Sequence, residues 1–491
     1  MRPFIRKGKS KSGATTVQVE FKRGRIRERI VHVGSAHNEV ELQLLINKAN
    51  EIIDEGQLVF DLGEQSTEHE LYLERSYSKT LWDALEGVYN HLGFNQIEDE
   101  VFKQLVLARI IEPTSKLETI RVLDELGLDA PSNTTIHRSL KRSIEADYRS
   151  IISDACFLAT TKTALRLVLY DVTTLYFEAQ KEDDFRKPGL SKERKLDPQI
   201  VVGLLVDRRG FPLEVMSFEG NTAEVKTIEP VLSSFIKRHG LAGITVAADA
   251  AMLSSANITA LEQMGYTYII ASKMTRFPLE IENYLNISPD TVLKDGQIFE
   301  SKMSVTVNGK RTHRRCVYQY RKKRADLDLR NIEKSVAKAT KMIEGKADVK
   351  RNRFLQLTGG IRELNVSLIE THKKRAGIKG YLTNLKISAE EVITAYHQLF
   401  EVEKSFRMSK SDLRARPIFH HTRQSIEAHL TIVFAALAIS RYIESKTSVS
   451  IKRFVKALLP IRTGVIVLNG KSHHVKPRLT ERAAELLDLL G

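Results

Sequence analysis

Two aspartates occur where a carboxylate needs a partner. Asp171 stands inside the apolar and β-branched run from Leu167 to Phe177, which has the composition of a buried strand. Asp249 directly follows a second run of this kind, Ile244 to Ala248. A buried, ionised carboxylate costs on the order of several kcal/mol unless it is paired or binds a metal. The two acids are therefore candidates for a functional site.

A third acid, Glu403, lies in a predicted helix. The residues Ser388-Ala389-Glu390-Glu391 form a capping box, so we expect a helix to begin at Ala389. Along it, Tyr396, Glu403 and Lys410 are spaced seven residues apart. Two helical turns return to nearly the same direction, so these three side chains should project from one face.

The same helix face carries groups that can hold phosphates. Arg407 lies four residues after Glu403, so an acid, two cations and a phenol would share the surface. Tyr396, Arg407 and Lys410 are our candidates for contact with a DNA backbone. An alternative remains open, in which Glu403 and Arg407 form only a surface ion pair on an ordinary amphipathic helix.

Two aspartates and a glutamate suit a reaction at phosphorus. Hydrolysis or transfer of a phosphodiester needs an activated nucleophile, a stabilised leaving oxygen and neutralised charge, and two Mg²⁺ ions provide all three. Mg²⁺ prefers oxygen ligands, with one or two carboxylates for each ion. We therefore predict that Asp171, Asp249 and Glu403 are catalytic metal ligands, that Asp171 bridges two Mg²⁺ ions, and that Mn²⁺ substitutes.

The composition favours a polyanionic partner. The 491 residues include 76 Lys and Arg against 61 Asp and Glu, which gives a net charge of +15. Nucleic acid is the default partner, with double-stranded DNA as our hypothesis, and a basic surface that is merely solvated is the alternative. Only two cysteines occur, so a disulfide framework or a zinc site is not indicated. The longest apolar run, Leu430 to Ile439, is too short to cross a bilayer, and we expect a cytoplasmic protein without a membrane partner.

One short helix is a candidate for the DNA groove. Ser132 can cap a helix over residues 134–142, whose exposed face would carry hydroxyl and basic groups. A helix of this kind could read DNA, but an ordinary helical bundle with a basic outer face explains the pattern equally well.

The acids and the helix around Glu403 resemble a known family, the bacterial insertion-sequence transposases of the DDE type. The group in question places its last acid in a Tyr-x2-Arg-x3-Glu-x6-Lys signature, which reads here Tyr396, Leu399, Glu403 and Lys410. Leu399 replaces the arginine. Further similarity extends over residues 170–174, 189–199, 218–222, 248–249, 380–384 and 389–440.

The resemblance implies a fold and a domain order. The expected fold class is α/β, an RNase H-like mixed sheet with flanking helices, interrupted by a β-rich insertion and preceded by a basic β hairpin and a helical domain. The predicted parts are a basic, β-containing N-terminal region (1–75), a helical domain that is a candidate for DNA binding (76–160), the first part of the core (161–271), the insertion (272–378), the second part of the core (379–445) and a helical C-terminal region (446–491).

The resemblance also implies an activity. Such a protein binds the terminal inverted repeats of its element, cleaves the ends and joins the freed 3′-hydroxyls to target DNA, as a homodimer on DNA at the bacterial nucleoid. Two alternatives keep the same core: a domesticated DNA-binding protein without the chemistry, and a structure-specific nuclease without strand transfer.

Overall fold

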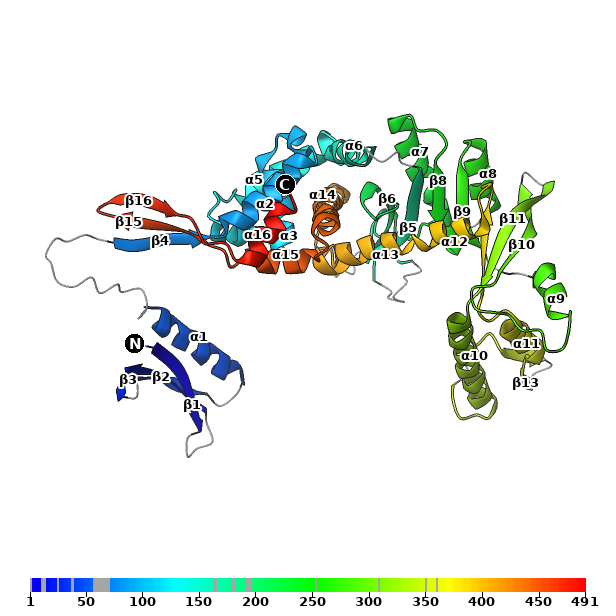
Figure 1. Cartoon of the computed structure of the whole chain (residues 1–491), viewed down its shortest axis with the longest axis horizontal. Coiled ribbons are helices and arrows are strands. Elements are labelled where there is room, and N and C mark those ends of the chain that lie inside the picture. The colour runs from blue at the N-terminus through cyan, green and yellow to red at the C-terminus, as the bar shows by residue number, and fades with distance from the viewer. Residues whose placement is uncertain are drawn as a thin grey trace. The chain divides into compact units, whose positions relative to one another are not determined.

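The computed structural model divides the chain into two compact units, residues 1–70 and 71–491 (Figure 1). The structure describes residues 2–9, 15–23, 26–36, 39–55, 71–161, 166–177, 182–189, 197–252, 254–272, 274, 276–307, 310–348, 351–358 and 361–491. Of the similar segment 189–199, residues 190–196 therefore lie outside the described part. The finer division into six parts stays a prediction.

The first unit is a small sheet with one helix. Three antiparallel strands lie in the order β1 (Arg2–Lys9), β2 (Thr15–Arg23) and β3 (Ile26–Ala36), followed by α1 (Glu39–Glu55). Val17 and Val19 of β2 are buried against Ala49 of α1. We expected only a basic β hairpin in this region, and the structure adds a third strand and a helix.

The second unit is built on an eight-stranded sheet. Its strand order is β10-β11-β14-β9-β8-β5-β6-β7. The strands are β5 (Leu167–Tyr176), β6 (Gln199–Asp207), β7 (Pro212–Glu219), β8 (Thr245–Ala248), β9 (Thr267–Ser272), β10 (Ile298–Val307), β11 (Lys310–Tyr320) and β14 (Ile378–Thr383). Strands β5, β6 and β7 form an antiparallel meander, whereas β8 and β9 run parallel to β5. This is the RNase H-like mixed sheet that the sequence predicted.

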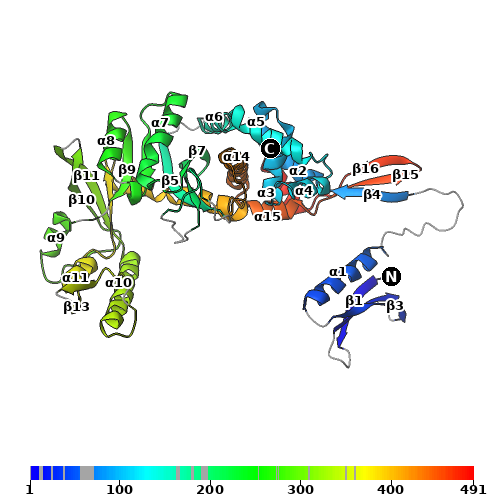
Figure 2. The same ribbon diagram turned by 180° about the vertical axis from the view of Figure 1, so that it is seen from behind.

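Helices cover both faces of the sheet (Figures 1 and 2). On one face, α7 (Ile228–His239) and α8 (Ser255–Gln263) bury Val231 and Ile258 against Val168 and Tyr170 of β5. On the other face, Leu169 and Leu175 of β5 belong to a larger core built mainly with helices. The strand alternates between the two cores, as expected for a sheet covered on both sides.

The insertion contains strands and helices. Strands β10 and β11 extend the main sheet beside β14. The remaining elements are α9 (Leu279–Leu285), α10 (Lys322–Ile343), β12 (Leu355–Thr358), β13 (Ile361–Leu364) and α11 (Val366–Lys374). Phe354 packs between α10 and α11 in a small core of its own. Helix α10 is amphipathic, with Ile332, Ala339 and Met342 on its buried side.

The prediction of one continuous helix from Ala389 to Lys410 is wrong. The capping box at Ser388 starts α12 (Ala389–His397) as predicted, but α13 (Phe400–Arg407) is a separate helix and a π-helical turn covers Met408–Asp412. At the break, the amide of Leu399 donates to the carbonyl of Tyr396, and the amide of Glu401 donates to the carbonyl of Gln398. These backbone hydrogen bonds span three residues, as in a 3₁₀ turn, instead of the four of an α-helix. The face predicted for Tyr396, Glu403 and Lys410 is therefore divided.

A helical region precedes the sheet, as predicted. It consists of α2 (Lys79–His91), α3 (Glu100–Ile111), α4 (Thr119–Glu125), α5 (Asn133–Glu145) and α6 (Tyr148–Thr161). The C-terminal part adds α15 (Ile451–Leu458) and α16 (Glu481–Asp488). It also contains β15 (Thr463–Leu468) and β16 (Lys471–Val475), which form a three-stranded sheet with β4 (Leu71–Tyr77). The C-terminal part is therefore not wholly helical.

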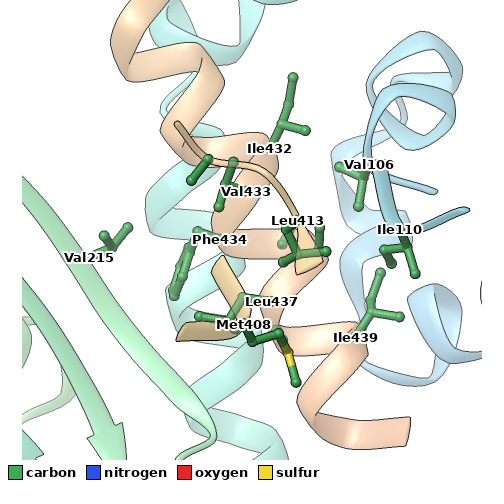
Figure 3. Packing of buried hydrophobic residues seen from close by; sticks show 14 of the residues in the cluster. Val106, Ile110, Val215, Met408, Leu413, Ile432, Val433, Phe434, Leu437 and Ile439 are labelled. Carbon is green, nitrogen blue, oxygen red and sulfur yellow. The ribbon is translucent and has the colours of Figure 1, made fainter. Parts of the chain in front are cut away.

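Helix α14 (Arg423–Thr447) joins the helical region to the sheet (Figure 3). Its side chains pack against Val106 and Ile110 of α3 and against Val215 of β7. Among the described helices it is the one long and apolar enough to cross a membrane, but 89% of that stretch is buried inside the protein. Burial on this scale is typical of the central helix of a hydrophobic core.

The turn between β6 and β7 anchors α13. Asp207 shapes the turn by accepting hydrogen bonds from the amides of Arg209 and Phe211, both at 2.8 Å. The carbonyl of Gly210 accepts hydrogen bonds from Ser405 Oγ of α13, at 2.7 Å, and from Arg441 Nε of α14, at 3.2 Å. The three elements form a clamp that fixes α13 against the sheet.

Replacement of Gly210 by alanine should loosen this clamp. Gly210 has φ of +79°, and a Cβ there would meet the Arg441 guanidinium and lie 2.9 Å from the carbonyl oxygen of Glu401. We expect the free energy of unfolding to fall by about 1 kcal/mol for the backbone conformation and by about 1–3 kcal/mol more for overpacking. Denaturant unfolding followed by circular dichroism measures the total loss.

The matched control is Gly265→Ala. Gly265 has a similar φ of +74°, and nothing lies within 4 Å of its Cβ position. It should lose only the backbone contribution. Equal losses in the two variants would show that the clamp is not tight.

Candidate active site

The register of β5 and β8 brings two predicted ligands together. The strands run parallel, with Leu169 beside Ala247 and Tyr170 beside Ala248. The next positions along the two chains are Asp171 and Asp249. Neighbouring strands lie about 4.8 Å apart, and parallel neighbours point to the same face. The two aspartates therefore project side by side toward the face covered by α12 and α13.

Tyr396 holds Asp249 from above this face. The Tyr396 hydroxyl donates a hydrogen bond to Asp249 Oδ1 at 3.2 Å. Its ring is buried and lies 4.8 Å from the ring of Tyr381, centroid to centroid. Burial and then the charge of Asp249 raise the pKa of the hydroxyl, so it remains a donor. The hydroxyl thus positions a carboxylate within the protein, and the contact of Tyr396 with DNA stays a prediction.

Lys379 of β14 is a member of this site that the sequence analysis missed. Its ammonium nitrogen lies 4.3 Å from the centroid of the Tyr396 ring, within the range of a cation–π contact. Burial lowers the pKa of Lys379, Arg324 lowers it further, and Asp249 and Glu403 raise it. One half-buried ammonium thus lies within the electrostatic range of two of the three predicted ligands.

Glu403 projects from the exposed side of α13. Val402, Ser405 and Phe406 form the buried side of this short helix, whereas Glu403 and Arg407 are exposed. Within the described part of the chain, Glu403 and Arg407 form no ion pair, and the Arg407 guanidinium lies over the Phe400 ring at 5.7 Å. The simple surface pair is thus not the reason for this spacing, and both groups remain accessible.

Lys410 lies on the same side of the sheet but outside α13. It lies in the π-helical turn after α13 and is half-buried. With Thr173 and Leu175 of β5, it lines a small apolar cavity beside the strand that carries Asp171. The π-helical turn therefore directs Lys410 toward β5.

The donor set fits a hard divalent cation. Asp171 and Asp249 supply neighbouring carboxylates, and Tyr396 holds one of them in place. Among the described residues, no three Asp, Glu, His or Cys side chains are gathered closely enough to share one metal ion. The structure therefore brings two of the three predicted ligands together, and the addition of Glu403 stays a prediction.

Helix α5, the candidate for the DNA groove, is capped by Ser132 as predicted. Its exposed side carries Arg138 and Lys141, but Arg142 bonds to the buried carboxylate of Asp99, with Nη2 2.8 Å from Oδ2. Asp99 in turn caps α3. The helix thus has a packing role, and DNA contact by its outer face stays a prediction.

An aspartate pair on adjacent central strands of an RNase H-like sheet defines a class of enzymes that process nucleic acids. A family model described as "Transposase DDE domain" matches residues 162–439. Because the match covers more than half of the chain, the protein belongs to the transposase DDE-domain family, whose members cleave and transfer DNA. The resemblance found in the sequence is thereby confirmed.

Comparisons with individual proteins give weaker similarities than the family model does. No curated protein matches the chain. Eight chains of solved structures match. One is a piggyBac transposase in a synaptic complex with hairpin DNA, solved by cryo-EM, which is 11% identical with a TM-score of 0.38. The alignment covers 78% of this chain and 70% of that chain.

Removal of the Tyr396 hydroxyl should weaken metal use. Tyr396→Phe keeps the ring but leaves Asp249 without its donor, and loss of such a supporting hydrogen bond costs about 10- to 100-fold in metal affinity or activity. We expect the Mn²⁺ concentration for half-maximal DNA cleavage to rise about 10-fold or more.

Tyr381→Phe is the control. Tyr381 is equally buried and packs on the same ring, but its hydroxyl makes no hydrogen bond within the described residues. Its Mn²⁺ dependence should stay close to that of the unmodified protein. The same shift in both variants would contradict a specific role for the Tyr396 hydroxyl.

Proposed function

We propose that this protein is a DNA transposase that binds the terminal inverted repeats of an insertion sequence, cleaves the ends and joins the 3′-hydroxyls to target DNA. The observation that carries the proposal is the alignment of Asp171 and Asp249 on adjacent strands, beneath the helices that carry Tyr396 and Glu403. Membership of the family and the net charge of +15 support a DNA substrate.

Asp171, Asp249 and Glu403 would hold two Mg²⁺ ions, for which Mn²⁺ substitutes. When bound, such ions activate a nucleophile and neutralise charge on the phosphate. The Tyr396 hydroxyl holds the Asp249 carboxylate in a fixed orientation. The Lys379 ammonium offsets the repulsion between the carboxylates, since both Asp249 and Glu403 act on it.

The exposed Arg407 of α13 and the half-buried Lys410 of the π-helical turn would position the DNA. Arg407 lies on the same exposed surface as Glu403, where a phosphate could approach both. Lys410 approaches from the side of β5. Contacts of this kind fix the register of a duplex without reading its sequence. Two ends must be held together for transfer, so we propose a homodimer on DNA.

Three conservative variants test the chemistry: Asp171→Asn, Asp249→Asn and Glu403→Gln. Each keeps the size of the side chain and removes a charged ligand, so we expect cleavage of duplexes that carry the element's ends to fall at least about 1,000-fold, or about 4 kcal/mol. Cleavage should require Mg²⁺ or Mn²⁺ and stop with a chelator. Gel electrophoresis of labelled duplexes measures the rates.

Glu390→Gln is the matched control, because Glu390 is an exposed acid of the neighbouring helix α12. It should cleave normally. Normal cleavage by all three ligand variants would exclude the proposed mechanism. Addition of a target plasmid then separates the alternatives, because a nuclease gives cleaved ends without joined products and a DNA-binding derivative gives neither.

A further inference from the structure

Basic side chains gather where the helical region meets the catalytic core. They come from α3, from the segment between α3 and α4, from the loop after the π-helical turn and from α14, which packs beside α3 (Figure 3). We refer to them as the junction cluster: Arg109, Lys116, Arg414, His420 and His429.

Direct contacts connect the members of the cluster. Lys116 Nζ lies 3.1 Å from His429 Nδ1, and His429 Nε2 lies 3.1 Å from the carbonyl oxygen of Ala415. With its proton on Nε2, His429 donates to Ala415 and accepts from Lys116. The rings of His420 and His429 are 5.5 Å apart, centroid to centroid. The two loops and α14 are therefore held together by basic groups.

Within the part of the chain that the structure describes, the cluster has no acidic partner. Arg109 is only 7% exposed, and no hydrogen bond or ion pair of its guanidinium is found within the described residues. The charged groups that shift the pKa values of Arg109, His420 and His429 are all basic. By contrast, the buried Arg441 bonds to Glu401, and the half-buried Arg149 pairs with Glu427. The junction cluster thus lacks the carboxylate that balances these other arginines.

The electrostatic consequence appears in the pKa values. Burial, followed by the basic groups of Lys116 and Arg109, lowers the pKa of His420 to about 3. Burial and then Arg109 also lower the pKa of Lys116 well below its usual value. Burial and Arg414 lower the pKa of Arg109 to about 10, so its guanidinium is still charged at neutral pH. A buried cation without a partner is expensive, and a bound anion would remove this cost.

The members of the cluster differ in exposure. Arg414 is exposed, His420 and Lys116 are half-buried, and Arg109 is the innermost member. His137 of α5, which also acts on His420, is exposed. An approaching anion therefore meets the exposed cation Arg414 first, and Arg109 is the member most withdrawn from solvent.

The position of the cluster relates it to the candidate active site. The loop that carries Arg414 and His420 continues the sheet, because Ile418 forms a parallel bridge with Phe177 at the end of β5. Asp171 lies six residues before Phe177 on the same chain, which corresponds to about 20 Å of strand. The end of β5 that this loop joins therefore lies within one turn of duplex DNA, about 34 Å, of Asp171.

We propose that the junction cluster binds a backbone phosphate of the DNA that occupies the active site. The inference rests on the proposed function, which supplies the DNA. A phosphate would accept hydrogen bonds from Arg109 and Arg414 and would tie the helical region to the catalytic core when DNA is present.

The test measures DNA affinity against salt. A 30-base-pair duplex of arbitrary sequence serves as the probe, in the presence of a chelator, because phosphate contacts do not depend on sequence. We expect Arg109→Met to bind about 10-fold more weakly and to reduce the slope of log affinity against log salt by about 0.9, the value for one lost phosphate contact. Its unfolding midpoint without DNA should equal or exceed that of the unmodified protein, because a buried unpaired charge is gone.

Two further variants keep the result decisive. Arg414→Gln changes an exposed side chain and should fold normally, and it too should lower the salt slope. Arg482→Gln removes one positive charge from α16, where Arg482 pairs with Glu485, and should leave affinity and slope unchanged. Unchanged slopes in both Arg109→Met and Arg414→Gln, or an equal decrease in Arg482→Gln, would overturn the proposal.

The outcome can be separated from a failure of the proposed function. If the unmodified protein neither binds the duplex nor cleaves the element's ends, the proposed function itself is wrong. If it does both, and the Arg109 and Arg414 variants keep its salt slope, only the phosphate site is wrong. Asp171→Asn should lose cleavage and keep the slope, which shows that the two assays report on different sites.

Discussion

The parallel pairing of β5 with β8 is the constraint on which the site depends. In this register, Leu169 and Ala247 face the helical core, so the aspartates two residues later face it as well. A shift of one residue would turn one carboxylate toward the opposite core, where Val168 and Val246 pack. The apolar residues that fix the register therefore also bring the two acids together.

A second constraint is the clamp that holds α13. The sheet can place only two of the acids, and the third comes from a helix more than 150 residues further along the chain. Ser405 and Arg441 bind the Gly210 turn on the buried side of α13, which leaves the opposite side, with Glu403, facing outward. Rigid support of this kind, from groups that never touch a substrate, is what holds a helical ligand near a sheet.

The sequence predicted those parts of the fold in which local pattern and tertiary packing agree. The apolar runs of β5 and β8 and the capping box at Ser388 all carry local signals, and all are found in the structure. The break between α12 and α13 could not be predicted. Residues 388–412 contain neither proline nor glycine, and the break serves the packing of Leu399 and Val402 into the core.

Lys379 shows the limit of the criterion that identified Asp171, a single charge within an apolar strand. Asp171 drew attention because it is the single charge in an apolar strand. Lys379 meets the same criterion within Ile378 to Leu382, and the alternation that puts Ile378 and Leu382 in one core puts Lys379 and Tyr381 on the face of the acids. The signal was therefore present, but a lysine in a strand suggests no metal. The structure explains the lysine, because its ammonium lies over the ring of Tyr396, whose hydroxyl binds Asp249.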